Sequence, residues 1–266
     1  MNTMDVYASR SPLRRTAPGF KILWAVIPLL ICIGFGSFSV SFLTIAVMIY
    51  CTVLRGGTPW KTYLHFLRIP AGFICIGAIV ILVVRRENME SLLIGVQIGT
   101  GYFGISRISL LQSMALICKA MAGVCCMYFL TFTTPMNGLL HTFRQIHCPV
   151  VLIELMELIY RFIFVLSGEA GRMHTAQSVR LGYIGFRRAL HSTGGLAALL
   201  LLRALRRGDR VYTALEARCY TGILPYLRQE YTKIRAGAVW GLILFCCLLI
   251  GLGILEKQVL GNLFSI

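Results

Sequence analysis

Long apolar runs alternate with basic connections along the first half of the chain. Residues 22–53 are almost wholly apolar, and this run is longer than the roughly 20 residues that one membrane helix needs. Gly34, Gly36, Ser37 and Ser39 interrupt it, so the run predicts two helices joined as a hairpin. Further apolar runs follow at residues 70–84, 110–132 and 236–255. The pattern is typical of an all-α polytopic membrane bundle with about five to six membrane helices.

Two stretches leave the boundaries of the helices open. The run at residues 70–84 is short for a span, and it extends back to near Leu64 if Pro70 is accommodated as a kink. Residues 91–105 are rich in glycine, which is compatible with a short re-entrant or interfacial segment and does not fix its place. The number of spans depends on these two stretches.

The interval between residues 133 and 235 differs from the rest because it is strongly basic. It holds 14 Lys and Arg residues, out of 26 in the chain, against only six acidic residues, out of 10. Positive residues accumulate on the cytoplasmic side of membrane proteins, so we expect this interval, the N-terminal segment and the connection 54–69 to be cytoplasmic. The same topology places the connection 85–107 outside, although it carries three arginines. The predicted organisation is a set of N-terminal membrane helices (1–132), a cytoplasmic or interfacial region (133–235) and a C-terminal membrane helix (236–266).

Two helices are predicted inside this basic interval. Residues 150–167 are apolar apart from Glu154, Glu157 and Arg161, whose spacing places them on one helix face. That face fits an intramembrane ion site or, as we favour, a helix at the membrane surface or against other helices, with an internal ion pair. Residues 190–205 form a shorter apolar run with arginines around it, which is typical of an interfacial amphipathic helix.

Composition narrows the class. Hydrophobic residues make up 57% of the chain and charged residues only 14%, against about 25% in soluble domains, so this is an integral membrane protein. The formal net charge of +16 does not indicate nucleic-acid binding, because the basic residues are spread between apolar spans. Most of the 10 cysteines lie inside apolar runs and are expected to act as small hydrophobic residues. The polar, basic first 21 residues lack the pattern of a cleavable signal peptide.

No motif for catalysis or ligand binding accompanies these features. The five histidines show no metal-ligand spacing, and the chain lacks the Gly-rich loop with which P-loop proteins bind ATP. No Gly-x-Ser-x-Gly element and no catalytic carboxylate pair stand out either. The sequence therefore offers no candidate catalytic residue and no candidate site for a metal, ATP or another cofactor.

Two arginine-centred elements stand out in the basic interval. The first is Ala176-Gln177-Ser178-Val179-Arg180-Leu181-Gly182, and the second is Glu216-Ala217-Arg218-Cys219-Tyr220. In both, small residues flank one arginine, as a helix end requires if its backbone is to fit closely into a partner's groove while the arginine makes directed hydrogen bonds. The alternative is a positive cytoplasmic loop in which the alanines are incidental.

Further motifs flank these elements in a fixed order. They are Asp5-Val6-Tyr7-Ala8, Pro18-Gly19-Phe20-Lys21, Thr133-Thr134-Pro135, Cys148-Pro149, Tyr160-Arg161-Phe162-Ile163 and, around the second arginine, Ala214 to Gly222. In this order, and over nearly the whole chain, the motifs resemble those of the transmembrane (T) component of energy-coupling-factor transporters. Within that family, the chain looks like the CbiQ branch, which serves cobalt uptake.

The resemblance implies a role for the arginine-centred elements. A T component of this family holds two ATP-binding cassette ATPase subunits through cytoplasmic coupling helices, and each Ala-Arg-Gly-type motif enters a groove on one ATPase. Arg180 and Arg218 would each pair with an acidic group or a helix C-terminus there. The coupling residues implied in this chain are Ala176, Val179, Arg180, Leu181, Ala217, Arg218 and Cys219, supported by Arg161, Glu216 and Gly222.

Two departures from the family pattern concern these same helix ends. Leu181 and Cys219 stand where the family commonly has Gly. A side chain at such a position reduces close backbone approach or the freedom to adopt a left-handed conformation. Because both arginines remain, we expect docking to persist with altered detail.

The same resemblance implies the location and the partners. We expect a multi-pass protein of the cell membrane, embedded in the lipid bilayer, with a separate substrate-binding membrane subunit of the CbiM type. The ATPases would use ATP, and this chain would carry out no chemistry. Nickel or a vitamin is the alternative substrate, because specificity lies in another subunit.

Two other classes of protein remain open. The first is a secondary transporter or channel with Glu154, Glu157 and Lys119 as buried charges, although no internal repeat is seen. The second is a membrane-embedded enzyme, which needs clustered Asp or His residues near one membrane face, whereas the ten acidic residues are scattered.

Overall fold

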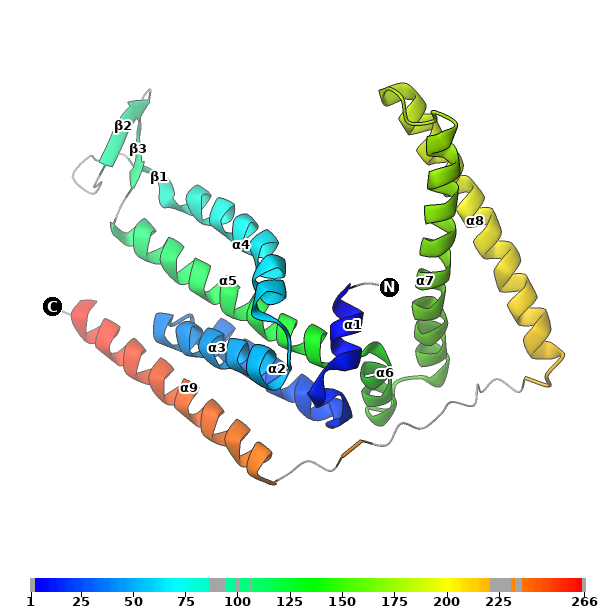
Figure 1. Cartoon of the computed structure of the whole chain (residues 1–266). Coiled ribbons are helices and arrows are strands. Elements are labelled where there is room, and N and C mark those ends of the chain that lie inside the picture. The colour runs from blue at the N-terminus through cyan, green and yellow to red at the C-terminus, as the bar shows by residue number, and fades with distance from the viewer. Residues whose placement is uncertain are drawn as a thin grey trace. The chain divides into compact units, whose positions relative to one another are not determined.

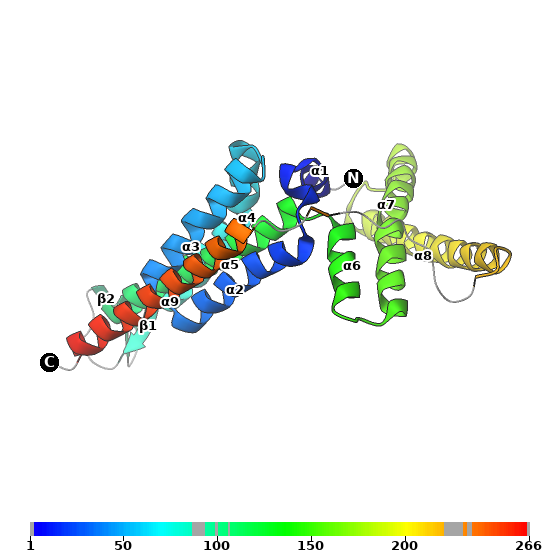
Figure 2. The same ribbon diagram turned by 90° about the horizontal axis from the view of Figure 1, so that it is seen from below.

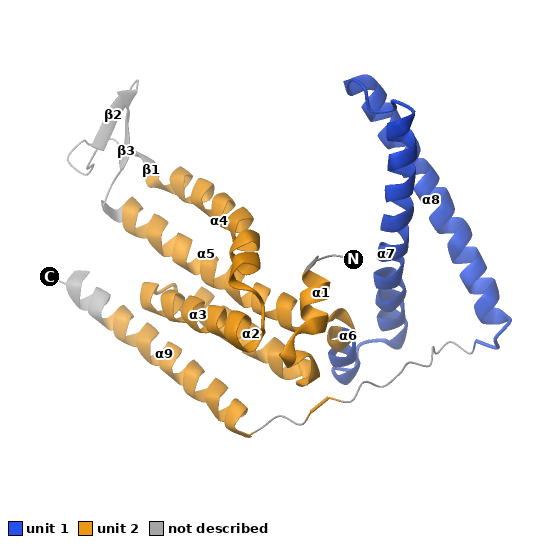
Figure 3. Cartoon of the chain, in the orientation of Figure 1, with its two compact units in different colours: residues 1, 140–229 blue, residues 2–139, 230–266 orange. Residues whose placement is uncertain are grey.

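The chain folds into two compact units that differ in character (Figure 3). The computed structural model describes residues 3–86, 94–98, 101–105, 107–220, 231–232 and 236–264. The unit drawn in orange, called here the membrane unit, comprises residues 2–139 and 230–266. The unit drawn in blue, called the hairpin unit, comprises residues 140–229, with residue 1 grouped beside them.

Within the described residues, five helices of the membrane unit are long and apolar enough to cross a membrane, which confirms the predicted polytopic helical bundle (Figures 1 and 2). They are α2 (Pro18–Phe35), α3 (Phe38–Tyr50) continued by the π-helical turn η2 (Cys51–Arg55), α4 (Trp60–Leu82), α5 (Arg107–Thr133) and α9 (Ala236–Phe264). The chain reverses between α2 and α3 at Gly36, whose φ of 62° is left-handed, so the predicted hairpin is confirmed. Helix α4 begins at Trp60, ten residues before the apolar run that predicted it, and Pro70 is accommodated inside the helix.

Helix α5 forms the centre of this bundle, because α2, α3 and α4 all pack against it. The core contains Met48, Tyr63, Cys125, Cys126 and Phe132, all of them at most 1% exposed. The buried cysteines fill space among aromatic rings, as expected for small hydrophobic residues.

A small antiparallel sheet connects α4 to α5. Its strands are β1 (Val83–Arg86), β2 (Ile94–Ile98) and β3 (Gly101–Ile105), in the order β1-β3-β2. The sequence left the place of residues 91–105 open, with a re-entrant or interfacial segment as one interpretation, and it did not predict the strands within them. Glycines within β2 and β3 interrupt the alternation of apolar and polar side chains by which a strand is recognised in a sequence.

The N-terminal segment packs against one end of the membrane unit. It consists of α1 (Thr3–Arg10) and the 3₁₀ turn η1 (Pro12–Arg15). The Ser11 hydroxyl donates to the carbonyl of Gly56 over 2.9 Å, and the hydroxyls of Tyr7 and Thr62 lie 3.3 Å apart. The N-terminal segment and the connection between α3 and α4 therefore lie at the same end, as the predicted topology requires.

The opposite end of the bundle is held by a carboxylate of the last helix. Glu256 of α9 accepts hydrogen bonds from the backbone N–H groups of Phe38 and Ser39, over 2.9 and 3.1 Å. These amides belong to the first turn of α3, where no intrahelical acceptor is available. Glu256 thus caps a helix that lies far from it in sequence.

Two long helices form the hairpin unit. Helix α6 (Met136–Gln145) leads into it, and α7 (Val150–Val179) and α8 (Phe186–Glu216) then pack against each other. Glu169 of α7 pairs with Arg203 and Arg207 of α8 at 3.9 and 3.5 Å. The helices predicted at residues 150–167 and 190–205 are confirmed but are longer than expected, and neither is among the five candidate spans.

Candidate functional site: two arginine-centred helix ends

The first arginine-centred element is the C-terminus of α7. Leu181 has a φ of 58°, and the N–H of Gly182 donates to the carbonyl of Gln177 over 2.9 Å. The N–H of Leu181 donates to the carbonyl of Ser178 over 3.0 Å. These two bonds around a left-handed residue define a Schellman motif, in which Arg180 is the last residue before the chain turns.

The second element repeats this geometry at the C-terminus of α8. Cys219 has a φ of 56°, and the N–H of Tyr220 donates to the carbonyl of Leu215 over 3.1 Å. The N–H of Cys219 donates to the carbonyl of Glu216 over 2.9 Å, so Arg218 occupies the position that Arg180 has in the first element. Leu181 and Cys219 are therefore the left-handed residues of the two motifs, at the positions where the resemblance indicated Gly.

Both arginines are exposed, and so are the other coupling residues predicted from the sequence. Those exposed residues are Ala176, Val179, Leu181, Glu216, Ala217 and Cys219. The two elements lie at opposite ends of α8, whose 31 residues correspond to a length of about 45 Å. At this separation, a single binding groove cannot contain both arginines. Gly222, predicted to support the second element, lies outside the described residues.

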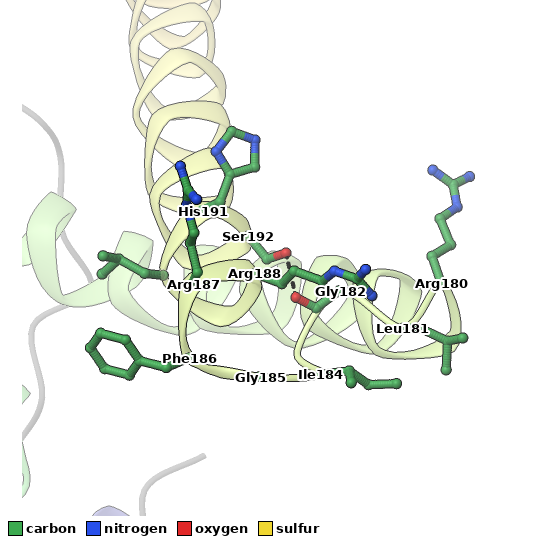
Figure 4. A pocket seen from close by; sticks show the side chains of 11 residues that line it. Arg180, Leu181, Gly182, Ile184, Gly185, Phe186, Arg187, Arg188, His191 and Ser192 are labelled. Carbon is green, nitrogen blue, oxygen red and sulfur yellow. Dashed lines mark hydrogen bonds between the residues drawn. The ribbon is translucent and has the colours of Figure 1, made fainter.

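The turn between α7 and α8 is braced by side chains of both helices (Figure 4). The Ser192 hydroxyl donates to the carbonyl of Gly182 over 2.7 Å, and the Tyr183 hydroxyl donates to the side-chain oxygen of Gln177 over 2.7 Å. A Cβ atom on Gly182 would lie 2.8 Å from the Ser192 hydroxyl oxygen and 2.9 Å from the carbonyl oxygen of Gln177. Only glycine fits here, because both contacts are too close for a carbon atom.

This turn presents apolar and basic side chains together. Phe186 is 86% exposed and Leu181 is 61% exposed. They line an open hollow with Arg180, Arg187 and Arg188 (Figure 4). Exposed aromatic and aliphatic side chains beside arginines are typical of a surface that binds another protein.

The second element is held by a contact that the sequence did not reveal. The Tyr220 hydroxyl donates to Oε2 of Glu154 over 2.9 Å, and Glu154 itself is buried at 5% exposure. The hydrogen bond to this carboxylate raises the pKa of Tyr220 above its usual range. Residues 66 positions apart thus join the start of α7 to the end of α8.

The acidic residues of α7 have other partners than the sequence suggested. Glu157 lies 3.7 Å from the guanidinium of Arg144 in α6, whereas Arg161 is exposed. The internal ion pair expected along α7 is therefore replaced by one between α6 and α7. Glu154 and Glu157 lie on α7, which is not among the five candidate spans found in the described residues. In the part of the chain that the structure describes, no three His, Cys, Asp or Glu side chains are grouped as a metal site requires.

Comparison with known proteins gives this arrangement a context. A family described as CbiQ, cobalt transport protein, matches residues 9–231 of the chain. The chain is 36% identical over 184 residues to the cobalt transport protein CbiQ of Rhodobacter capsulatus, which covers 69% of this chain and 70% of that protein. It is 28% identical over 172 residues to the protein of the same name from Salmonella typhimurium, covering 65% of this chain and 76% of that protein.

The name of one longer relative combines CbiM and CbiQ. The chain is 32% identical over 251 residues to a putative fused cobalt transport protein CbiMQ of Methanocorpusculum labreanum. The match covers 94% of this chain but only 41% of the fused protein. The chain therefore spans less than half the length of that relative.

Proposed function

Because this chain belongs to the CbiQ family of cobalt transport proteins, a family of membrane transport components, we propose that it is the transmembrane coupling subunit of an energy-coupling-factor importer. In this role it transmits the motion of two ATPase subunits to a separate substrate-binding membrane subunit. The substrate of the complex is cobalt. Residues 133–235 form the coupling region, on the cytoplasmic side of the cell membrane.

One observation carries this proposal: Arg180 and Arg218 end two helices with the same geometry and are both exposed. A guanidinium at such an end can make several charge-assisted hydrogen bonds to carboxylates or to the carbonyls of a helix C-terminus. Two equivalent attachment points about 45 Å apart suit two ATPase subunits better than one. Each arginine then belongs to the groove of a different ATPase.

The hairpin unit gives such attachment a mechanical consequence. When ATP binding draws the two ATPases together, the two ends of α8 are displaced with them. The α7–α8 hairpin is braced at one end by Ser192 and at the other by the hydrogen bond between Tyr220 and Glu154, so it moves as a rigid lever. Its movement reorients the substrate-binding subunit, while this chain carries out no chemistry and binds neither ATP nor another cofactor.

The fused relative supports the choice of the third partner. Its name joins CbiM and CbiQ in one chain, which fits a CbiM-like substrate-binding subunit beside the present protein. A nickel or vitamin importer remains the alternative within the same class, because the other subunit selects the substrate. The secondary-transporter alternative loses support. Glu154 accepts a hydrogen bond from Tyr220, and it lies on α7, which is not a candidate span.

Coexpression with the ATPase and substrate-binding subunits tests the proposal. The wild-type chain should copurify with two ATPase subunits, and the double variant Arg180→Ala/Arg218→Ala should lose them together with cobalt uptake, since truncating an interface arginine costs about 2 kcal/mol or more. Arg172→Ala/Arg210→Ala is the matched control. It removes an exposed arginine eight positions before Arg180 and another eight positions before Arg218, and it should leave assembly unchanged.

Either of two results would contradict the coupling role. The first is normal assembly and uptake in the Arg180→Ala/Arg218→Ala variant. The second is a fully active transporter purified without any ATPase subunit.

A further inference from the structure

Lys21 is a buried cation inside the membrane unit. Its side chain is only 3% exposed, and its ammonium nitrogen Nζ donates to the carbonyl of Thr133 over 2.8 Å. Thr133 is the last residue of α5, so this carbonyl is one of those that the helix itself leaves without a donor. None of the three ion pairs among the described residues includes Lys21. Burying an ammonium group is costly, and a helix C-terminus compensates part of this cost.

A second contact lies on the same N-terminal segment. The backbone N–H and the hydroxyl of Thr232 both donate to the carbonyl of Arg15, over 2.9 and 3.0 Å. Thr16 and Thr232 also form an isolated β-bridge. Residues 15–21 therefore contact both Thr133, the last residue of α5, and Thr232, which lies about one hundred positions later in the chain.

Close packing joins these contacts into one junction. A Cβ atom built on Gly138, in the first turn of α6, would lie 3.3 Å from Pro18 and 3.6 Å from the hydroxyl of Tyr231. The chain leaves the membrane unit for the hairpin unit after residue 139 and returns at residue 230. The chain thus leaves the membrane unit a few residues after Thr133 and returns a few residues before Thr232. We define the junction by Arg15, Lys21, Thr133 and Thr232.

We propose that Lys21 is a positioning residue for coupling, which fixes the point where the hairpin unit is anchored so that its movement reaches the membrane helices. This inference rests on the coupling function proposed above. A lever transmits force only if its attachment does not yield. Without the ammonium group, the carbonyl of Thr133 loses its donor from α2, and part of the hairpin movement is dissipated as local movement at the junction.

Reconstituted vesicles containing the complete complex test this role. In Lys21→Met, the ATPases should still copurify and hydrolyse ATP, while cobalt taken up per ATP hydrolysed should fall at least about tenfold, within the range of measured coupling between sites. Lys21→Arg should retain most coupling, because it keeps a buried cationic donor. The matched control Lys61→Met, which removes an exposed lysine at the start of α4, should leave the ratio unchanged.

A cross-linking measurement separates this inference from the proposed function, because it needs no partner subunit. Cysteines at Thr16 and Thr232, in a background without the native cysteines, should form a disulfide in the full-length chain. Adding Lys21→Met should slow that reaction several-fold. If the wild-type chain fails to bind ATPases but Lys21→Met still slows cross-linking, the coupling function is wrong and the junction is real.

Two results would overturn the role of Lys21. One is a wild-type ratio of uptake to hydrolysis in Lys21→Met, and the other is unchanged cross-linking in that variant. If Lys21→Met does not accumulate in the membrane, Thr232→Val decides, because it removes one hydrogen bond of the junction and leaves Lys21 in place. An unchanged ratio in Thr232→Val then refutes the junction as the anchor.

Discussion

The membrane unit and the hairpin unit contain similar apolar side chains but bury them differently. Tyr63, Met48 and Phe132 are fully buried among the helices of the membrane unit, whereas α8 has no buried residue at all. Lipid explains the exposed apolar residues of membrane-crossing helices, but α7 and α8 are not candidate spans. The membrane unit is thus specified by contacts within the chain, whereas the exposed apolar side chains of α8 are typical of a surface that binds a partner or a membrane.

The largest expected effect separates two phenylalanines. Phe132 packs against four aromatic rings, with centroid distances from 5.6 to 6.3 Å. Phe132→Ala should lower the free energy of unfolding in detergent by about 3–5 kcal/mol, because it leaves a cavity. Phe186→Ala should change it by no more than about 0.5 kcal/mol, since that side chain is 86% exposed.

Thermal unfolding and ATPase copurification together read out this pair. Phe186→Ala should weaken copurification without lowering stability. Phe132→Ala should lower stability, and the fraction that folds should copurify with the ATPases as the wild type does. Equal loss of stability in the two variants would contradict the contrast between the units.

An intermediate effect is expected within the hairpin unit itself. Gly182→Ala places a Cβ against Ser192 and Gln177, so we expect a local cost of about 1–3 kcal/mol from the forced shift. Gly171→Ala, in the middle of α7, meets no atom within 4 Å and should stabilise the helix by up to about 1 kcal/mol. Hydrogen exchange of residues 174–195 measures both effects, and faster exchange in Gly171→Ala than in Gly182→Ala would refute the assigned packing.

The smallest expected effect concerns the two left-handed residues. Leu181→Gly and Cys219→Gly should each stabilise their helix end by about 0.5–1 kcal/mol, because glycine removes a steric cost that its own backbone entropy only partly offsets. Leu181→Ala and Cys219→Ala are the matched controls, since they shorten the side chain but keep the strained backbone. A stabilisation by Ala as large as that by Gly would show that the backbone conformation is not the cause.

The length of the apolar runs predicted where the spans lie, since lipid and core impose the same apolar requirement on every turn of a membrane helix, but left their number at five to six and the start of α4 open. The two arginine-centred helix ends were also accessible, because a Schellman motif involves only six consecutive residues. The suspected need for left-handed freedom at Leu181 and Cys219 agrees with their positive φ. The assigned roles of these residues in coupling stay predictions.

Contacts between distant residues were not accessible from the sequence. Lys21 and Thr133 belong to two of the quoted motifs, but nothing in either indicates that they meet across 112 positions. In the same way, Arg161 is four residues from Glu157 and was the obvious partner on one helix face, yet Arg144 pairs with it instead. Helix spacing predicts neighbours within one helix and is silent about the helix that packs alongside.

The cap that Glu256 provides for α3 sets an order on biosynthesis. The N–H of Phe38 donates to the carboxylate of Glu256, which is synthesised 218 residues later. During translation, the first four spans are therefore complete while the first turn of α3 still lacks its acceptor. The capping of α3, a helix synthesised early, is therefore complete only after α9 has been added.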